Sequence, residues 1–306
     1  MAVTANFTPH LPTAIVPLTT GMPARSGAVG NSPVAFNVLG SQVVTSLPTI
    51  INSAANTVTN FVIPSLQIGT ITRTGLQPFN NLTVVPGVKY NLLLTMTPND
   101  IYLEHLGQSA VRINGQIWMR HNLGANTALN PDQSPSVIGL HGNYYQWGKA
   151  AVVADASTPP GIISGYDNST TMAPNSWNSG TETNPIKTAA DPCPEGFRIP
   201  SRAEMDLLVS ATISSTIGTW NESPTNYSAA KVLRSRRNAN VQLTFPAAGG
   251  RLDQFGDLLR RAAVAFVWSS LKSTPTQAIR MALRLTTDDF DLSVASWGSP
   301  VRCIAQ

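Results

Sequence analysis

Residues 191–201 read DPCPEGFRIPS, and this stretch decides how the second half of the chain is interpreted. It holds Cys193, one of only two cysteines, between Pro192 and Pro194. Each proline lacks a backbone N–H, so the stretch cannot lie inside a helix or a central strand. It predicts a rigid connection that leads into the next regular element.

That next element is predicted to be a helix over residues 201–212. Ser201 is a suitable N-cap, and Glu204 follows it at the spacing of a capping box. The apolar residues then fall on one face of a helix. We expect the buried face to contain Met205, Leu207, Leu208 and Val209.

The second cysteine, Cys303, lies in VRCI near the C-terminus. Two interpretations are open: a long-range disulfide to Cys193, or two separate buried thiols. A bridge closing a loop of this length would stabilise the fold by about 4–5 kcal/mol. We favour the disulfide because the composition is typical of a protein outside the cytoplasm.

The composition limits the classes of function. Charged residues make up only 12% of the chain, against about a quarter in an average protein. The net charge of +4 is too small to indicate nucleic-acid binding. No apolar run is long enough to span a membrane. MAVTANFTPH at the start has no basic and apolar leader segments, so we expect a secretion signal to have been removed.

The first half of the chain reads as β structure. Strand patterns occur at 34–45, 59–74 and 84–96, and no amphipathic helix is evident before residue 100. We therefore predict an antiparallel β-sandwich over 1–97. Residues 98–110 are predicted to be a linker.

Residues 111–306 are predicted to form a second domain of the α+β class. A strand at 111–119 is expected to begin it, and SAAKVLRSRR at 228–237 is predicted to be a second short helix. The remaining patterns are strands: VQLTFPA, AFVWSS, AIRMALRL and PVRCIA. The predicted fold class of the whole chain is mainly β with some α.

Several motifs in this half resemble, in order, the Fibrobacter succinogenes major paralogous domain. They are NGQIWMRHNLGA at 114–125, GNYYQWGK at 142–149, DPCPEGFRIPS at 191–201, FPAAGGR at 245–251, VWSS at 267–270 and WGSPVRCI at 297–304. The resemblance covers roughly 110–306. It implies a C-type-lectin-like fold, found in surface proteins of Bacteroides-like bacteria, in which the first and last strands pair, here 111–119 with 300–305.

A second resemblance rests on PGVKYNLLLTM at 86–96, which is similar to the closing strand of fimbrillin domains. Those β-sandwich pilins assemble into type V pili when one subunit donates a strand to the next. The resemblance implies an adjacent pilin subunit as a partner by strand addition. It also implies a position at the pilus tip for a chain that carries a binding module.

The motifs of common catalytic and metal sites are missing. The lectin-like fold also occurs in formylglycine-generating oxidases, which need a pair of reactive cysteines in the C-terminal part. Here Cys303 is alone in that part, and Cys193 is better explained as its structural disulfide partner. The four histidines are scattered, and no HExxH, GxSxG or Cys-x-x-Cys occurs. Thr287–Asp291 places three carboxylates close together, and we expect a solvated turn rather than a calcium site. We therefore predict no enzyme activity, no cofactor and no metal.

The basic residues are an alternative source of function. They are Arg234, Arg236, Arg237, Arg251, Arg260 and Arg261. An acidic glycan or nucleic acid would suit such a set, but aromatic residues are not interleaved with it as in a nucleic-acid platform. We expect solvated faces.

Between the family-like positions of 251–297 the residues are unusual for that family. The region resembles the variable proteins of diversity-generating retroelements, which change exposed residues on a rigid lectin-like frame. Aromatic residues and arginine dominate interface energetics. The predicted ligand-binding face is Asp253, Phe255, Arg260, Arg261, Phe266, Lys272, Arg280, Arg284, Asp289, Phe290 and Trp297. Trp118, Trp147 and Trp268 are assigned to the core.

The sequence thus predicts a secreted, cell-surface or fimbrial adhesin at a pilus tip. Its expected partner is a host or bacterial surface protein or glycan. The alternative is a structural pilin or cell-envelope subunit, in which the second domain is a spacer without a dedicated ligand.

Overall fold

The computed structural model describes residues 98–306 except 171 and 253, and the backbone of four strands within the first 97 residues. The chain divides into two compact units, Met1–Leu94 and Thr95–Gln306. Strands predominate, and every strand pair in the described parts is antiparallel. The prediction of a mainly β chain with some helix is confirmed at this level.

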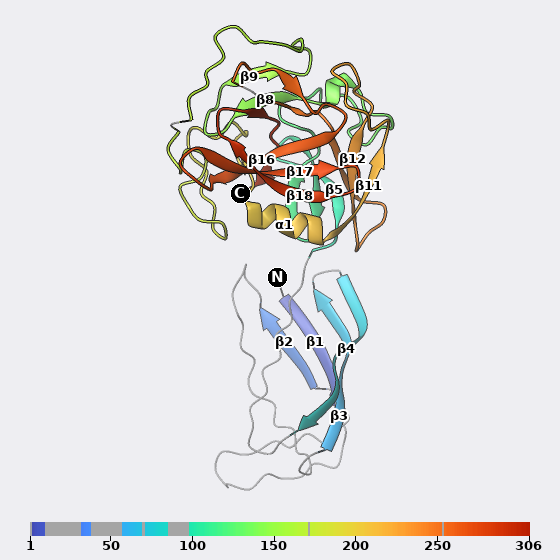
Figure 1. The fold of residues 1–306 in the computed structure, drawn as a ribbon. Coiled ribbons are helices and arrows are strands. Elements are labelled where there is room, and N and C mark those ends of the chain that lie inside the picture. Colours follow the sequence, from blue (N-terminus) through green and yellow to red (C-terminus); the bar gives the residue numbers. More distant parts are fainter. Residues whose placement is uncertain are drawn as a thin grey trace. The chain divides into compact units, whose positions relative to one another are not determined.

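The described part of the first unit is one sheet with strand order β2-β1-β3-β4 (Figure 1). Its strands are β1 (Ala2–Pro9), β2 (Ser32–Asn37), β3 (Thr57–Ile68) and β4 (Ile71–Val84). The predicted strand pattern at 59–74 falls on β3 and β4. The strand predicted at 84–96 lies, after residue 84, outside the described residues, so the β-sandwich remains a prediction.

Four antiparallel sheets make up the described part of the second unit. The first has the order β10 (Phe197–Arg198), β20 (Ile304–Ala305), β7 (Gln116–Met119), β6 (Gln108–Ile113), β5 (Ile101–His105). The second has the order β15 (Leu258–Leu259), β14 (Gly250–Arg251), β19 (Gly298–Ser299), β8 (Asn143–Gln146), β9 (Val152–Asp155). The third is β11 (Thr212–Ile217), β12 (Ala230–Ser235), β13 (Gln242–Pro246), and the fourth is β16 (Val264–Lys272), β17 (Gln277–Arg284), β18 (Asp288–Val294). A short 3-10 helix occupies Ile138–Leu140.

The predicted helix is confirmed as α1 (Arg202–Ser210), and its capping box is present. The Glu204 backbone N–H donates to Ser201 Oγ, while the Glu204 carboxylate accepts from the Ser201 backbone N–H. Met205 and Leu208 are fully buried and Val209 packs beside them. Leu207 was predicted to be buried but is 50% exposed, because it lies on the outer face of the helix.

The Cys193–Cys303 disulfide is present, with a Cα–Cα distance of 5.9 Å. Asp191 fixes the connection around Cys193. One carboxylate oxygen accepts from the Cys193 backbone N–H at 2.8 Å, and the other accepts from the Ile199 N–H at 2.8 Å. Lys187 Nζ also lies 2.8 Å from this carboxylate. The stretch therefore has the rigid, non-regular structure that its prolines predict.

The helix predicted at 228–237 is wrong, because residues 230–235 form β12 in the middle of its sheet. β11 pairs on one side of it and β13 on the other. Ala, Lys, Leu and Arg are good helix formers, but hydrogen bonding on both edges overrides such local preferences. Lys231 is 2% exposed in this strand and forms an ion pair with Asp288 at 2.8 Å.

The start of the second unit also differs from the prediction. Residues 98–110 were expected to be a linker, but they contain β5 and the beginning of β6, which pair with each other. The strand predicted at 111–119 is divided between β6 and β7, and its second part pairs with the C-terminal segment as expected. Ile304 in β20 lies opposite Trp118 in β7, and the Met119 N–H donates to the Cys303 carbonyl.

The core has two main clusters in the described residues. One lies between α1 and the β16-β17-β18 sheet, which Figure 1 shows side by side. The other surrounds the disulfide and contains Trp147 and Trp268. Trp118, Trp147 and Trp268 are all 0% exposed, as predicted. Trp147 Nε1 donates to the Ser269 carbonyl and Trp268 Nε1 donates to the Tyr145 carbonyl, so these two indoles have polar partners inside the core.

Candidate ligand-binding pocket

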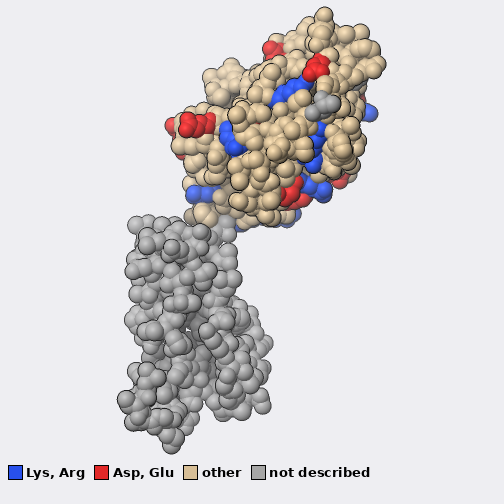
Figure 2. Space-filling model, turned by 90° about the vertical axis from the view of Figure 1, so that its left-hand side faces the viewer, with Lys and Arg blue, Asp and Glu red and all other residues tan. Residues whose placement is uncertain are grey.

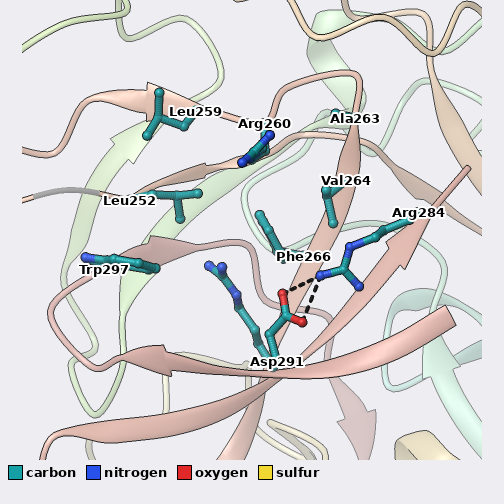
Figure 3. Close-up of a pocket in the computed structure, with 10 residues that line it drawn as sticks. Leu252, Leu259, Arg260, Ala263, Val264, Phe266, Arg284, Asp291 and Trp297 are labelled. Carbon is teal, nitrogen blue, oxygen red and sulfur yellow. Dashed lines mark hydrogen bonds and ion pairs between the residues drawn. The ribbon is translucent and has the colours of Figure 1, made fainter. Parts of the chain in front are cut away.

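A pocket of about 600 Å³ opens on the face of the β16-β17-β18 sheet that points away from α1. Figure 3 shows Leu252, Leu259 and Trp297 on one side of it, with Val264 and Phe266 on the other. Its lining residues are Leu252, Leu259, Arg260, Ala263, Val264, Phe266, Arg280, Arg284, Asp291 and Trp297. The volume falls within the range of about 300–1,000 Å³ that small-ligand pockets occupy.

The alternation of side chains along the strands determines which residues reach the pocket. Val264 lies opposite Arg284, and Arg280 lies opposite Asp291, all on the pocket side. The intervening residues point to the other face. There, Val267 and Met281 pack in the core cluster that includes α1.

Arg280 is the most unusual residue of the pocket, because its charge is buried and no described carboxylate forms an ion pair with it. The side chain is 3% exposed, and the guanidinium carbon lies 3.5 Å from the centre of the Phe266 ring and 5.6 Å from that of Trp297. Among the described residues it forms no ion pair, and its one hydrogen bond goes from Nη1 to Ser299 Oγ at 3.1 Å. Burial lowers the pKa of Arg280 to about 9, while the nearby Asp291 charge opposes this shift. The guanidinium therefore stays charged at neutral pH.

Arg284 differs from Arg280 because its charge is neutralised inside the pocket. Its Nη2 donates to both carboxylate oxygens of Asp291, at 2.8 and 2.7 Å (Figure 3). Nη1 also lies 3.4 Å from the Asp289 carboxylate. Two acidic side chains thus offset this one arginine, and Asp291, whose charge also acts on Arg280, is already paired with Arg284.

Arg260 stands at the rim of the pocket, in the turn between β15 and β16. Its side chain is exposed and pairs with Glu222 at 3.1 Å, and its backbone N–H donates to the same carboxylate. Its φ angle is 65°, and that of Ala262 is 61°. Left-handed backbone at residues other than glycine is costly and occurs often at binding sites. Arg260 is such a residue at the pocket rim, whereas Ala262 is fully buried in the same turn and does not line the pocket.

Five residues of the predicted binding face line the pocket: Arg260, Phe266, Arg280, Arg284 and Trp297. Asp289 lies next to them through its contact with Arg284. Phe255 is 47% exposed but does not line the pocket. Asp253 lies outside the described residues.

Three predicted residues have structural surroundings instead. Arg261 is 2% exposed and donates to the Pro224 and Ala156 carbonyls and to the Tyr144 hydroxyl. Lys272 Nζ donates to the carbonyls of Thr170 and Met172, and so holds the long loop that precedes Cys193. Phe290 belongs to the opposite face of its sheet, where it packs against the α1 cluster and below Arg202.

The aliphatic half of the pocket is not part of the predicted face. It consists of Leu252, Leu259, Ala263 and Val264, whereas the types that dominate interface energetics are aromatic residues and arginine. Asp291 was considered only as a member of a possible calcium cluster. Asp289 belongs to the predicted face, and strand alternation places Asp291, two residues later in β18, on the same side.

The acidic run at 287–291 is bound by basic side chains. Asp288 pairs with Lys231, and Asp289 and Asp291 pair with Arg284. Within the described residues, no three His, Cys, Asp or Glu side chains gather in an arrangement that could hold a metal ion.

The basic surface residues are dispersed. On the face shown in Figure 2, Lys and Arg side chains form small separate groups among uncharged residues. Arg251 is fully buried, and its Nη1 and Nη2 donate to the Pro159 and Thr158 carbonyls. Among the helices that the structure describes, none has the length and apolar character needed to cross a membrane.

Comparison with known proteins finds no matching family model, no matching curated protein and no matching solved structure.

Proposed function

We propose that this chain is a cell-surface or pilus-tip adhesin whose second unit binds a protein or glycan ligand through the pocket on the β16-β17-β18 sheet. The observation that carries the proposal is the convergence of five residues selected from the sequence on one half-apolar pocket. Their aromatic and arginine side chains are the types that dominate binding energetics.

Two further features support an extracellular location. The second unit is closed by a disulfide between residues 110 positions apart, and stable disulfides form mainly in oxidising compartments. The motif resemblance to lectin-like surface domains and the strand resemblance to fimbrillins agree with that location. On this proposal the second unit is the C-type-lectin-like binding module and the first is a fimbrillin-like sandwich that joins a neighbouring pilin by strand addition.

Binding arrays test the proposal directly. The full chain is applied to arrays of glycans and host surface proteins, and the interaction with any bound component is measured for Leu259→Asp and for Leu207→Asp. Both leucines are partly exposed, but Leu259 lines the pocket and Leu207 lies on α1. We expect Leu259→Asp to weaken binding at least about tenfold and Leu207→Asp to leave it unchanged.

Equal binding by both variants would contradict the proposed face. Electron microscopy of labelled pili separates the adhesin from the alternative, a structural pilin or envelope subunit. Label at the tip supports the adhesin. Label along the shaft supports the structural subunit, in which the second unit is a spacer.

A further inference from the structure

The pocket contains one buried positive charge, on Arg280, that has no ion-pair partner among the residues the structure describes. Glu222 pairs with Arg260, and Asp291 and Asp289 pair with Arg284. Within the described residues, Arg280 has no such partner. Burying an unpaired charge is costly, so a chain that keeps one in a pocket gains most when a ligand supplies the opposite charge.

The guanidinium of Arg280 also has hydrogen-bond donors to spare. It carries five N–H groups, and Ser299 accepts from Nη1 alone. Nε is buried and has no partner. The aromatic rings of Phe266 and Trp297 lie next to the guanidinium and hold it in place. A guanidinium held in this way is suited to a carboxylate, which accepts two parallel N–H bonds.

The remainder of the pocket specifies what is attached to that anion. Three of the other lining residues, Arg260, Arg284 and Asp291, are charged but ion-paired. The rest are apolar or aromatic: Leu252, Leu259, Ala263, Val264, Phe266 and Trp297. A sugar acid would bring several hydroxyl groups to a surface with few free polar partners, and unpaired polar groups are costly to bury. A single uncompensated charge likewise suits a monoanion better than a phosphate dianion.

We propose that the pocket recognises a peptide carboxylate next to an apolar side chain, with Arg280 binding the carboxylate and the aliphatic wall binding the side chain. This inference rests on the proposed function, because it names the ligand class for the same pocket. The carboxylate belongs to a chain terminus or to an acidic residue beside an apolar one. The partner is then a protein rather than a glycan.

The test uses small probes on the full chain labelled with ¹⁵N. The peptide probes are N-acetyl-phenylalanine and N-acetyl-leucine, with their uncharged amides as controls, and the sugar probes are N-acetylneuraminic acid and glucuronic acid. We expect the two acids to shift the Nε–H resonance of Arg280 and to bind at least about tenfold more tightly than the amides. The sugar acids should bind more weakly than the peptide acids.

Variants assign the effect to the residue. Arg280→Gln should reduce affinity for N-acetyl-phenylalanine at least about tenfold, and Arg280→Lys should recover only part of it because an ammonium lacks the planar fork. Arg236→Gln removes an exposed arginine outside the pocket lining and should have no effect. If the Arg280 variants do not fold, the Nε–H shift in the unchanged protein decides the question.

Three results would overturn the inference: equal binding of acid and amide, no binding of either acid, or tighter binding of a sugar acid. Its failure is distinguishable from failure of the proposed function. An array ligand that depends on Leu259 but not on Arg280 leaves the adhesin standing and removes the carboxylate. Probe binding at Arg280 together with label along the pilus shaft supports the carboxylate site and contradicts the tip adhesin.

Discussion

Removing the Cys193–Cys303 disulfide should strongly destabilise the second unit. The bridge joins residues 110 positions apart, and for a loop of that length the chain-entropy relation gives about 4.8 kcal/mol at 25 °C. We therefore expect Cys193→Ala/Cys303→Ala to lower the free energy of unfolding by about 4–5 kcal/mol. Cys193 and Cys303 are 5% and 0% exposed, so the small cavities left by alanine add to the loss.

Tryptophan fluorescence during urea unfolding measures this loss in the second unit alone. All six tryptophans lie between residues 118 and 297, so the first unit does not contribute to the signal. The bridge restricts the unfolded chain, and the urea m-value increases with the surface exposed on unfolding. The double variant should therefore show a lower midpoint and a larger m-value than the oxidised protein.

Wild-type protein unfolded in the presence of a reductant is the matched control, and it should resemble the double variant. A loss below about 2 kcal/mol with an unchanged m-value would refute the reasoning. It would mean that the bridge does not restrict the unfolded chain as the chain-entropy relation assumes.

Three other changes have defined expectations for stability. Arg302→Met should lower the free energy of unfolding in urea by about 3 kcal/mol or more. The buried arginine, 1% exposed, donates to the backbone carbonyls of Met119, Arg120 and Thr244, and the substitution leaves these carbonyls without that donor. A loss below about 1 kcal/mol would contradict this. Burial lowers the pKa of His141 from 6.5 to about 4, so the neutral imidazole is favoured in the fold, and stability present above pH 6.5 should fall by about 3 kcal/mol as the pH approaches 4. His141→Phe should lose that part of the pH dependence, and an unchanged slope would show that other groups cause it. Ser201→Ala should cost about 1 kcal/mol in thermal or urea unfolding through loss of the cap, and no loss would mean that the cap is dispensable.

The start of α1 was predicted well because the residues that determine it lie close together in the chain. The capping box of α1 needs only Ser201 and Glu204, so the helix start could be read directly. The segment 228–237 shows where local patterns fail. Its helix-forming residues became β12 because β11 and β13 supply hydrogen bonds on both sides, and neither partner is visible from the segment itself.

The binding residues were harder to predict, and two neighbouring arginines show why. Arg260 points to the rim of the pocket, whereas Arg261 is buried and contacts Tyr144, 117 positions earlier in the chain. Their residue type and local context are nearly the same. Only the tertiary contacts distinguish a surface residue from a structural one, so residue type alone selected both.

The β16-β17-β18 sheet separates the residues that hold the fold from those that face the pocket. Alternate residues such as Val267 and Met281 pack toward α1, which the capping box and the disulfide-linked connection position. Their neighbours along the strands face the pocket side, where Val264, Phe266 and Ala282 form a separate small cluster with Leu252. Substitutions at residues such as Arg284 can therefore change the chemistry of the pocket while the core that packs against α1 stays intact. Arg280 differs from Arg284 because it is buried against Phe266 and charged at the same time, so a change there alters packing and recognition together.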